Sequence, residues 1–154
     1  MKLLGHPVHP LFIHFPTALL PMDLILSVLY HATGNQSFYH AGFYCLAGGV
    51  LAGLPAILSG LIELITMPKG NKHAITLALY HGCMNGTILL LFAIICYKAW
   101  KIFPEIYLAS TNGIFVKAFL VIALFAGNYM GGKLIYKHHI GINLKQSLHG
   151  EMET

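Results

Sequence analysis

The fold is decided by the stretch from Gly42 to Ile65, which reads GFYCLAGGVLAGLPAILSGLIELI. Glu63 is the one charged residue in this stretch, and apolar and polar residues do not alternate along it. A helix that crosses the hydrocarbon core of a bilayer needs about 20 apolar residues. A single strand there would leave its backbone N–H and C=O groups unpaired in lipid. The stretch therefore predicts a membrane-spanning helix.

Three further apolar runs of the same kind, separated by short segments rich in Gly, Pro, Asn and Lys, cover residues 11–31, 74–100 and 114–135. Of the 154 residues, 56% are hydrophobic and 9% are charged. Soluble domains are about one quarter charged, so an ordinary soluble domain is excluded. We expect a single all-α domain over residues 1–154, an integral membrane four-helix up-down bundle with its termini on the same side.

The lysines indicate how this bundle is oriented. The terminal side carries Lys2, Lys69, Lys72, Lys137 and Lys145, with Lys133 close by, whereas the opposite side carries Lys98, Lys101 and Lys117. Cationic loop residues accumulate on the cytoplasmic side, which predicts that both termini lie in the cytoplasm. The net charge of +4 is spread over loops, so we expect the lipid bilayer as a partner and not nucleic acid. A homo-oligomer stays open.

The ten histidines are distributed unevenly between the two ends of the expected bundle. The terminal side receives His6, His9, His14, His73, His81, His138, His139 and His149, and Glu63 near the end of its span. The opposite side receives His31 and His40. The clustering remains if the helix boundaries shift by a few residues. It predicts a functional site at the terminal end.

The opening segment HPVHPLFIHFP, from His6 to Pro16, carries three of these histidines among three prolines. Residues before proline avoid the helical region, so we expect an extended or single-turn approach with regular helix from near Pro16. Pro21 frees the carbonyl of Thr17, which predicts a kink. Such a segment would hold its imidazoles with little conformational freedom.

Imidazoles bind haem iron, zinc and copper. A haem needs one axial histidine from each of two facing helices, and His14 and His81 lie at a comparable depth in the first and third spans. Our leading hypothesis is a b-type haem held by His14 and His81, with His9 or His138 as a substitute, in an electron-transfer subunit that has a redox membrane-protein partner.

Two other hypotheses remain open. The first is a zinc or copper site of a transporter or sensor, formed by His6, His9, His14 and Glu63. The second is a cofactor-free membrane scaffold whose histidines lie at the headgroups. The chain shows no nucleophile with its base, no phosphate-binding glycine loop and no dinucleotide fingerprint, so no catalytic residue is assigned and an enzyme is not the favoured reading.

Polar and small residues also occur inside the spans. Asp23, Asn85 and Asn128 predict a polar contact within the bundle, with a proton or ion path as the alternative. Small residues recur at helical spacing at Ala52, Ala56 and Gly60, at Ala78, Gly82 and Gly86, and at Gly127 and Gly131. These stripes favour close helix packing, and the alternative is that they clear space for a flat cofactor.

Four features of the chain are distinctive: the opening Gly5-His6-Pro7-Val8-His9-Pro10, the following His14-Phe15-Pro16, the third-span His81 and the closing stretch from Gly131 to His138. Together they resemble a bacterial family of predicted membrane proteins, domain of unknown function 2231. Lys133 stands where the family usually has an acid, and His139 where it tends to have glycine. The family is similar to the two-haem membrane cytochromes b, and some relatives are fused to Rieske domains. The resemblance implies a protein of the bacterial inner membrane that takes part in electron transfer, with one cofactor here because the far end offers only His31 and His40.

Overall fold

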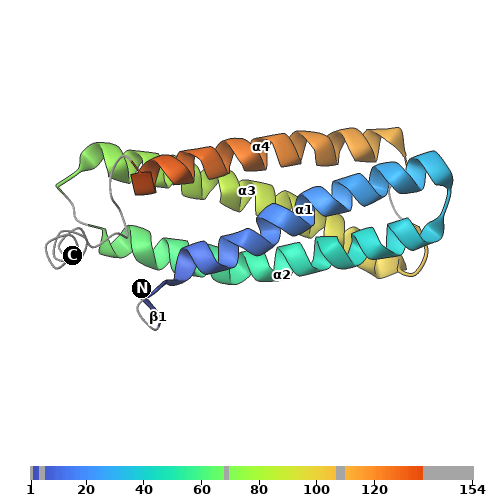
Figure 1. Cartoon of the computed structure of the whole chain (residues 1–154), viewed down its shortest axis with the longest axis horizontal. Coiled ribbons are helices and arrows are strands. Elements are labelled where there is room, and N and C mark those ends of the chain that lie inside the picture. Colours follow the sequence, from blue (N-terminus) through green and yellow to red (C-terminus); the bar gives the residue numbers. More distant parts are fainter. Residues whose placement is uncertain (1, 4–5, 68–69, 107–109, 137–154) are drawn as a thin grey trace, which may run out of the picture.

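The computed structural model describes residues 2–3, 6–67, 70–106 and 110–136, and its side chains are described from His9 onward. Two short antiparallel segments, β1 (Lys2–Leu3) and β2 (His6–Pro7), precede four helices. These helices are α1 (Val8–Thr33), α2 (Gln36–Thr66), α3 (Lys72–Ile102) and α4 (Thr111–Tyr136). They run alternately up and down, so α1 begins at the same end of the bundle as α4 ends (Figure 1). The expected all-α up-down bundle is confirmed.

Each of the four helices is long and apolar enough to cross a membrane. Large apolar side chains such as Leu51, Phe119 and Ile122 project outward and are about two-thirds exposed in the isolated chain. In water, so large an apolar surface would cause the protein to aggregate, whereas in a bilayer it contacts lipid. The chain is therefore an integral membrane protein with a lipid-facing exterior.

The first helix begins earlier than the proline pattern suggested. Regular helix starts at Val8 and not near Pro16, and the extended segment is limited to His6–Pro7. Pro10 is tolerated because the N–H groups of the first helical turn have no intrahelical partner in any case. Pro16 and Pro21 lie inside α1, where each removes one backbone hydrogen bond.

The other helices also extend beyond the apolar runs, because polar side chains cap them outside the hydrocarbon region. Asn35 accepts a hydrogen bond from the Ser37 backbone N–H at the start of α2, and Asn71 does the same for Ala74 at the start of α3. With 31 residues each, α2 and α3 are about 46 Å long, whereas the hydrocarbon core is about 30 Å thick.

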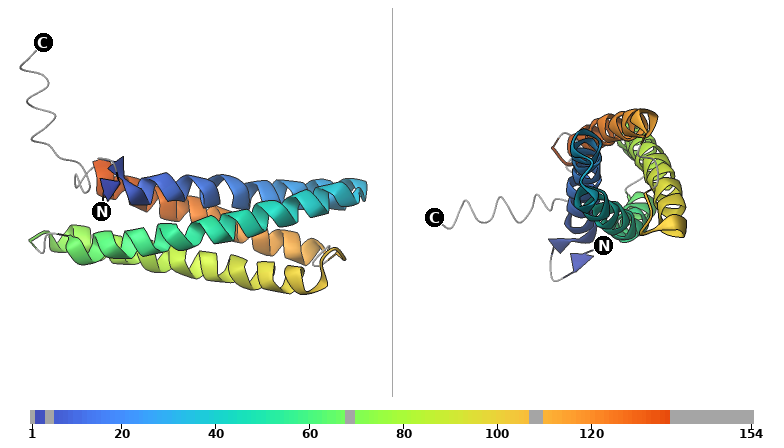
Figure 2. Two further views of the ribbon diagram at one scale, coloured as in Figure 1. Left: turned by 90° about the horizontal axis from the view of Figure 1, so that it is seen from below. Right: turned by 90° about the vertical axis from the view of Figure 1, so that its right-hand side faces the viewer.

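Viewed along its axis, the bundle places the four helices around a square (Figure 2). Each helix packs on its two neighbours, and α1 packs most extensively on α2. The central core is formed by apolar side chains of all four helices, among them Leu20, Leu46, Leu89, Phe92 and Leu120. α1 and α3 thus lie diagonally across the bundle, as do α2 and α4.

Candidate functional site

His9 lies in the first turn of α1, where it faces α2. Its Nδ1 is 2.8 Å from the carbonyl oxygen of Ala56 and 3.5 Å from the Ser59 hydroxyl. A carbonyl can only accept a hydrogen bond, so Nδ1 carries the proton and donates it. In the tautomer with its single proton on Nδ1, the Nε2 atom carries the lone pair.

His81 lies on α3 and is held by α4 in the same manner. Its Nδ1 is 2.9 Å from the carbonyl oxygen of Gly127, which again requires an N–H donor on Nδ1. Asn85, one turn further along α3, donates from Nδ2 to the His81 carbonyl at 3.1 Å and lies 3.1 Å from the His81 Nδ1. The Asn85 Oδ1 is buried and has no hydrogen-bond partner in the described structure.

The two imidazoles meet inside the bundle. Their ring centroids are 6.2 Å apart and their planes are nearly perpendicular, at 88°. One helix supplies each ring, and the two remaining helices supply the carbonyls of Ala56 and Gly127 that orient the rings. Metal-binding histidines usually donate their second ring N–H to a backbone carbonyl or a carboxylate, which fixes the tautomer. Both His9 and His81 meet this requirement.

Glycines on the facing helices leave the space that these side chains occupy. A Cβ atom at Gly60 would lie 3.0 Å from the His9 Cε1, and one at Gly131 would lie 2.7 Å from the His81 Cε1. A Cβ atom at Gly127 would lie 2.5 Å from the Asn85 Oδ1. By contrast, Gly82 and Gly86 face open space. The stripes that include Gly60, Gly127 and Gly131 thus allow close approach of polar side chains as well as of helices.

With α3 centred on a bilayer, the pair would lie within the hydrocarbon region and not at the headgroups. His81 is about 14 Å from the first residue of α3, at about 1.5 Å of rise per residue. If α3 is centred in the bilayer, about 8 Å of it extends beyond the hydrocarbon at each end. α1 begins nearer to the middle of the bundle than the points where α2 and α4 end (Figure 1). His9 in its first turn is therefore close to His81, with 6.2 Å between the ring centroids.

His14 is placed differently from His9, although both are on α1. Its side chain is exposed and lines an open, mostly apolar groove between α1 and α4, together with Ile13, Thr17, Ala18 and Asn128. The structure therefore brings His81 together with His9, the substitute ligand, and places His14 on an outward-facing surface.

The residues of the alternative metal site do not converge in the part of the chain that the structure describes. Among those residues, no group of three or more His, Cys, Asp or Glu side chains is close enough to hold a metal ion. Glu63 is partly exposed near the end of α2. The side chain of His6 and the whole of His138 lie outside the described part of the chain.

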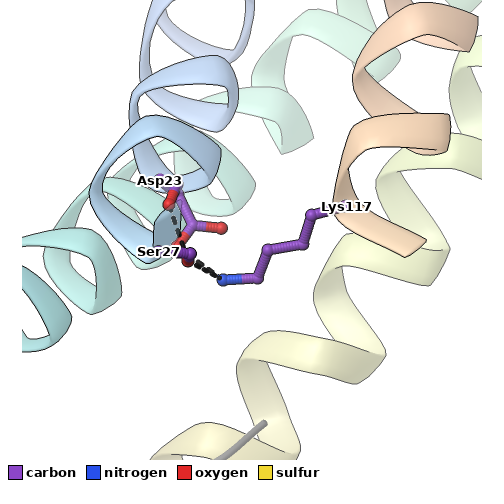
Figure 3. Close-up of polar contacts among 3 residues, drawn as sticks. All are labelled: Asp23, Ser27 and Lys117. Carbon is purple, nitrogen blue, oxygen red and sulfur yellow. Dashed lines mark hydrogen bonds and ion pairs between the residues drawn. The ribbon is translucent and has the colours of Figure 1, made fainter. Parts of the chain in front are cut away.

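The polar residues inside the spans form three separate contacts and not one. Asn85 contacts His81, and Asn128 donates from Nδ2 to the Thr17 hydroxyl at 3.0 Å, which links α4 to α1. Asp23 on α1 forms an ion pair with Lys117 on α4, with 2.7 Å between Oδ1 and Nζ (Figure 3). Lys117 was expected near a loop, yet it is 9% exposed and reaches into the bundle. The signal for this pair was Asp23 itself, because a mid-span carboxylate needs a partner.

Comparison with known proteins identifies the family of this chain. Residues 5–144 match the family described as predicted membrane protein DUF2231. The comparison with curated proteins found no match, and neither did the comparison with solved structures. Because the match covers nearly the whole chain, and the structure is a bundle of four membrane-spanning helices, the chain belongs to the DUF2231 family of predicted membrane proteins.

Proposed function

We propose that this protein is a membrane-bound electron-transfer subunit that holds a b-type haem through His9 and His81. The observation that carries the proposal is the arrangement of these two imidazoles, which lie close together and are each fixed by an Nδ1–H hydrogen bond to a backbone carbonyl, so that Nε2 would be the ligand atom. A bound haem would supply one-electron redox chemistry, and the two histidines would hold its iron.

The donor set favours a haem over a bare metal ion. A zinc site takes three or four protein ligands, whereas a haem iron needs only its axial ligands because the porphyrin supplies the other four. Two imidazoles meet here, and no third His, Cys, Asp or Glu joins them among the described residues. The pair therefore fits the haem requirement and falls short of the zinc requirement.

The two rings lie close enough to share one guest. Their centroids are 6.2 Å apart, so His9 and His81 together would hold one haem, and the haem would supply the redox chemistry. A Cβ atom at Gly60 would obstruct the ring of His9, and one at Gly131 would obstruct the ring of His81. Glycine at these two positions therefore leaves room for the two imidazoles.

We further propose that the protein lies in a bacterial inner membrane with both termini in the cytoplasm, and that it passes electrons to or from a membrane redox partner. Lys117 no longer counts toward the charge of the opposite side, because it is buried against Asp23. The remaining opposite-side lysines, Lys98 and Lys101, are outnumbered by those of the terminal side, which favours this orientation.

The proposal is tested by the visible spectrum of the full chain, expressed with ample haem supply and purified in detergent, before and after reduction with dithionite. We expect the sharp α and β bands of a low-spin haem on reduction, with about one haem per chain. A protein without porphyrin after such expression would refute the haem proposal. Stoichiometric zinc or copper without porphyrin would instead support the metal-site alternative. A protein that contains neither porphyrin nor metal would support the cofactor-free scaffold.

A further inference from the structure

A second polar site lies in the other half of the bundle, away from the two histidines. Asp23 is 1% exposed and accepts a hydrogen bond from the Lys117 ammonium group at 2.7 Å. The same ammonium donates to the Ser27 hydroxyl at 2.9 Å, and Ser27 donates to the Asp23 backbone carbonyl at 2.8 Å. Figure 3 shows how Lys117 extends from α4 toward these two residues of α1. Asp23 is about 21 Å along α1 from His9, at about 1.5 Å per residue.

Stability alone does not account for this pair. Removing two charges from water costs several kcal/mol per ion, and well-packed apolar residues in place of a buried pair are often equally or more stable. Ionisable residues at membrane depth are rare, and they pair with one another and mark ion pathways, proton relays or ligand counter-ions. The Asp23–Lys117 pair is therefore a candidate functional site.

One oxygen of Asp23 is left without a partner. Oδ1 accepts from Lys117, but Oδ2 is buried and has no hydrogen-bond partner in the described structure. Buried polar groups in proteins are almost always hydrogen-bonded to protein or to an ordered water molecule. A buried carboxylate oxygen without a donor is therefore a place where a water molecule or a proton is expected.

A small cavity adjoins the carboxylate. It is lined by Asp23 and Lys117, together with Tyr39, Phe43, Leu46, Ile95 and Ala99. Its free volume of about 10 Å³ is enough for about one water molecule. Polar groups of Asp23 and Lys117 line the cavity, so a water molecule there would have the partners that it needs.

The cavity lies toward the end of the bundle opposite the termini. Tyr39 is in the first turn of α2, Ala99 is in the last turn of α3, and Lys117 is about 9 Å from the start of α4, at about 1.5 Å per residue. The pair is thus separated from the aqueous phase at that end by a few side chains and one water-sized space.

We propose that Asp23 is a proton-binding site that exchanges protons with the aqueous phase at the end of the bundle opposite the termini. A hydronium ion at that face delivers its proton through the cavity water to Oδ2, and a water molecule is released. The carboxylate becomes a carboxylic acid whose Oδ2–H donates to the cavity water, while Oδ1 still accepts from Lys117. The charge of the pair changes from zero to plus one. This site is independent of the proposed haem.

The groups that face Asp23 come from all four helices. Ser27 on α1 does not titrate, and Lys117 on α4 stays protonated in the proposed step. Tyr39 on α2 lines the cavity, and the thiols of Cys45 on α2 and Cys96 on α3 are within electrostatic reach of Asp23. Asp23 is the one carboxylate in this set, which makes its protonation measurable by a method specific for carboxyl groups.

The experiment is an infrared titration of the purified full chain between about pH 3 and about pH 9, which brackets the ordinary pKa values of carboxyl and imidazole groups. The chain has five carboxylate side chains, so each contributes visibly to the C=O band of protonated carboxylic acids. We expect Asp23→Asn to lose the component of a buried, desolvated carboxylic acid. The matched control Glu105→Gln removes an exposed carboxylate and should keep that component.

Access is tested by transfer to heavy water. The Asp23 band should shift promptly in the wild type and more slowly in Ala99→Leu, which fills part of the cavity. If Asp23→Asn does not fold, the double variant Asp23→Leu/Lys117→Met, which replaces both charges by apolar side chains, gives the same comparison. A carboxylic-acid band that is identical in the wild type and in the folded variant would overturn the proposal. Equal exchange in the wild type and Ala99→Leu would overturn the route through the cavity.

Discussion

His9 and His81 belong to helices that lie diagonally across the bundle, yet their ring centroids are only 6.2 Å apart. Diagonal helices of a four-helix bundle meet only through side chains that point to its axis. Each of these two rings is also hydrogen-bonded to a backbone carbonyl of a third or fourth helix. The terminal end of the bundle is therefore organised around two imidazoles, and the predictions below follow from that arrangement and from the Asp23–Lys117 pair.

The first prediction concerns Gly131. A methyl group in Gly131→Ala would lie 2.7 Å from the His81 Cε1, so the ring must shift, and we expect the shift to weaken its hydrogen bond to the Gly127 carbonyl. We expect a loss of about 1 to 3 kcal/mol in the free energy of unfolding in detergent, typical of overpacking, and a loss of haem from the purified protein. Gly82→Ala is the matched control, since nothing lies within 4 Å of its added methyl group. The control should be neutral or slightly stabilising. Equal effects of the two substitutions would contradict the prediction.

The second prediction concerns the buried ion pair. Asp23→Ala leaves the Lys117 ammonium uncompensated at membrane depth, and we expect a destabilisation of about 3 to 5 kcal/mol. The double variant Asp23→Leu/Lys117→Met should recover most of this loss because it removes both charges. Chemical unfolding of the three proteins in the same detergent measures the difference. A single variant as stable as the wild type would show that the pair is not buried as described.

The third prediction concerns the packing of α2 against α3. A Cβ atom at Gly53 would lie 2.5 Å from the Leu89 Cδ1, so Gly53→Ala should lower the free energy of unfolding by about 1 to 3 kcal/mol. Shortening the facing side chain in Gly53→Ala/Leu89→Val should restore part of the loss. The thermal midpoint of detergent-purified protein is a sufficient measurement. If the double variant is no more stable than Gly53→Ala, the loss of stability does not come from a clash with Leu89.

The fourth prediction concerns the contact between Asn128 and Thr17, which links α4 to α1 through a hydrogen bond of 3.0 Å. Double-mutant cycles on such bonds between membrane helices average about 0.6 kcal/mol. A cycle with Thr17→Val and Asn128→Leu should give a coupling energy of this size. A coupling near zero would indicate that the two side chains do not interact in the folded protein.

The four helices could be predicted from the sequence because their apolar runs are long and the segments between them are polar. The sequence could not show which of the two histidines, His9 or His14, points into the bundle. The two residues are separated by about 140° around a helix with 3.6 residues per turn, so they point to different faces. A soluble helix reveals its inner face by its apolar stripe, but α1 is apolar on all sides because both lipid and protein interior accept apolar side chains.

Lys117 shows a second limit of the sequence. It stands near the start of an apolar run, where a lysine usually reaches the headgroups, and its long side chain could equally extend outward. Its inward direction follows from the rotation of α4 against α1, which brings it to Asp23. Asp23 indicated that a cationic partner was needed, but several lysines were compatible with that need. The end of the extended segment was also misplaced, because a proline in the first helical turn does not interrupt a helix.

The most direct test of the account is the spin state of bound haem in the wild type and in His9→Ala, His81→Ala and His14→Ala, measured by visible and electron paramagnetic resonance spectroscopy. Loss of one axial imidazole converts a six-coordinate low-spin iron to a high-spin one or releases the haem. We predict that His9→Ala and His81→Ala each do so and that added imidazole restores the low-spin spectrum, whereas His14→Ala retains it. A low-spin spectrum that survives in His9→Ala or His81→Ala and disappears in His14→Ala would contradict the assignment.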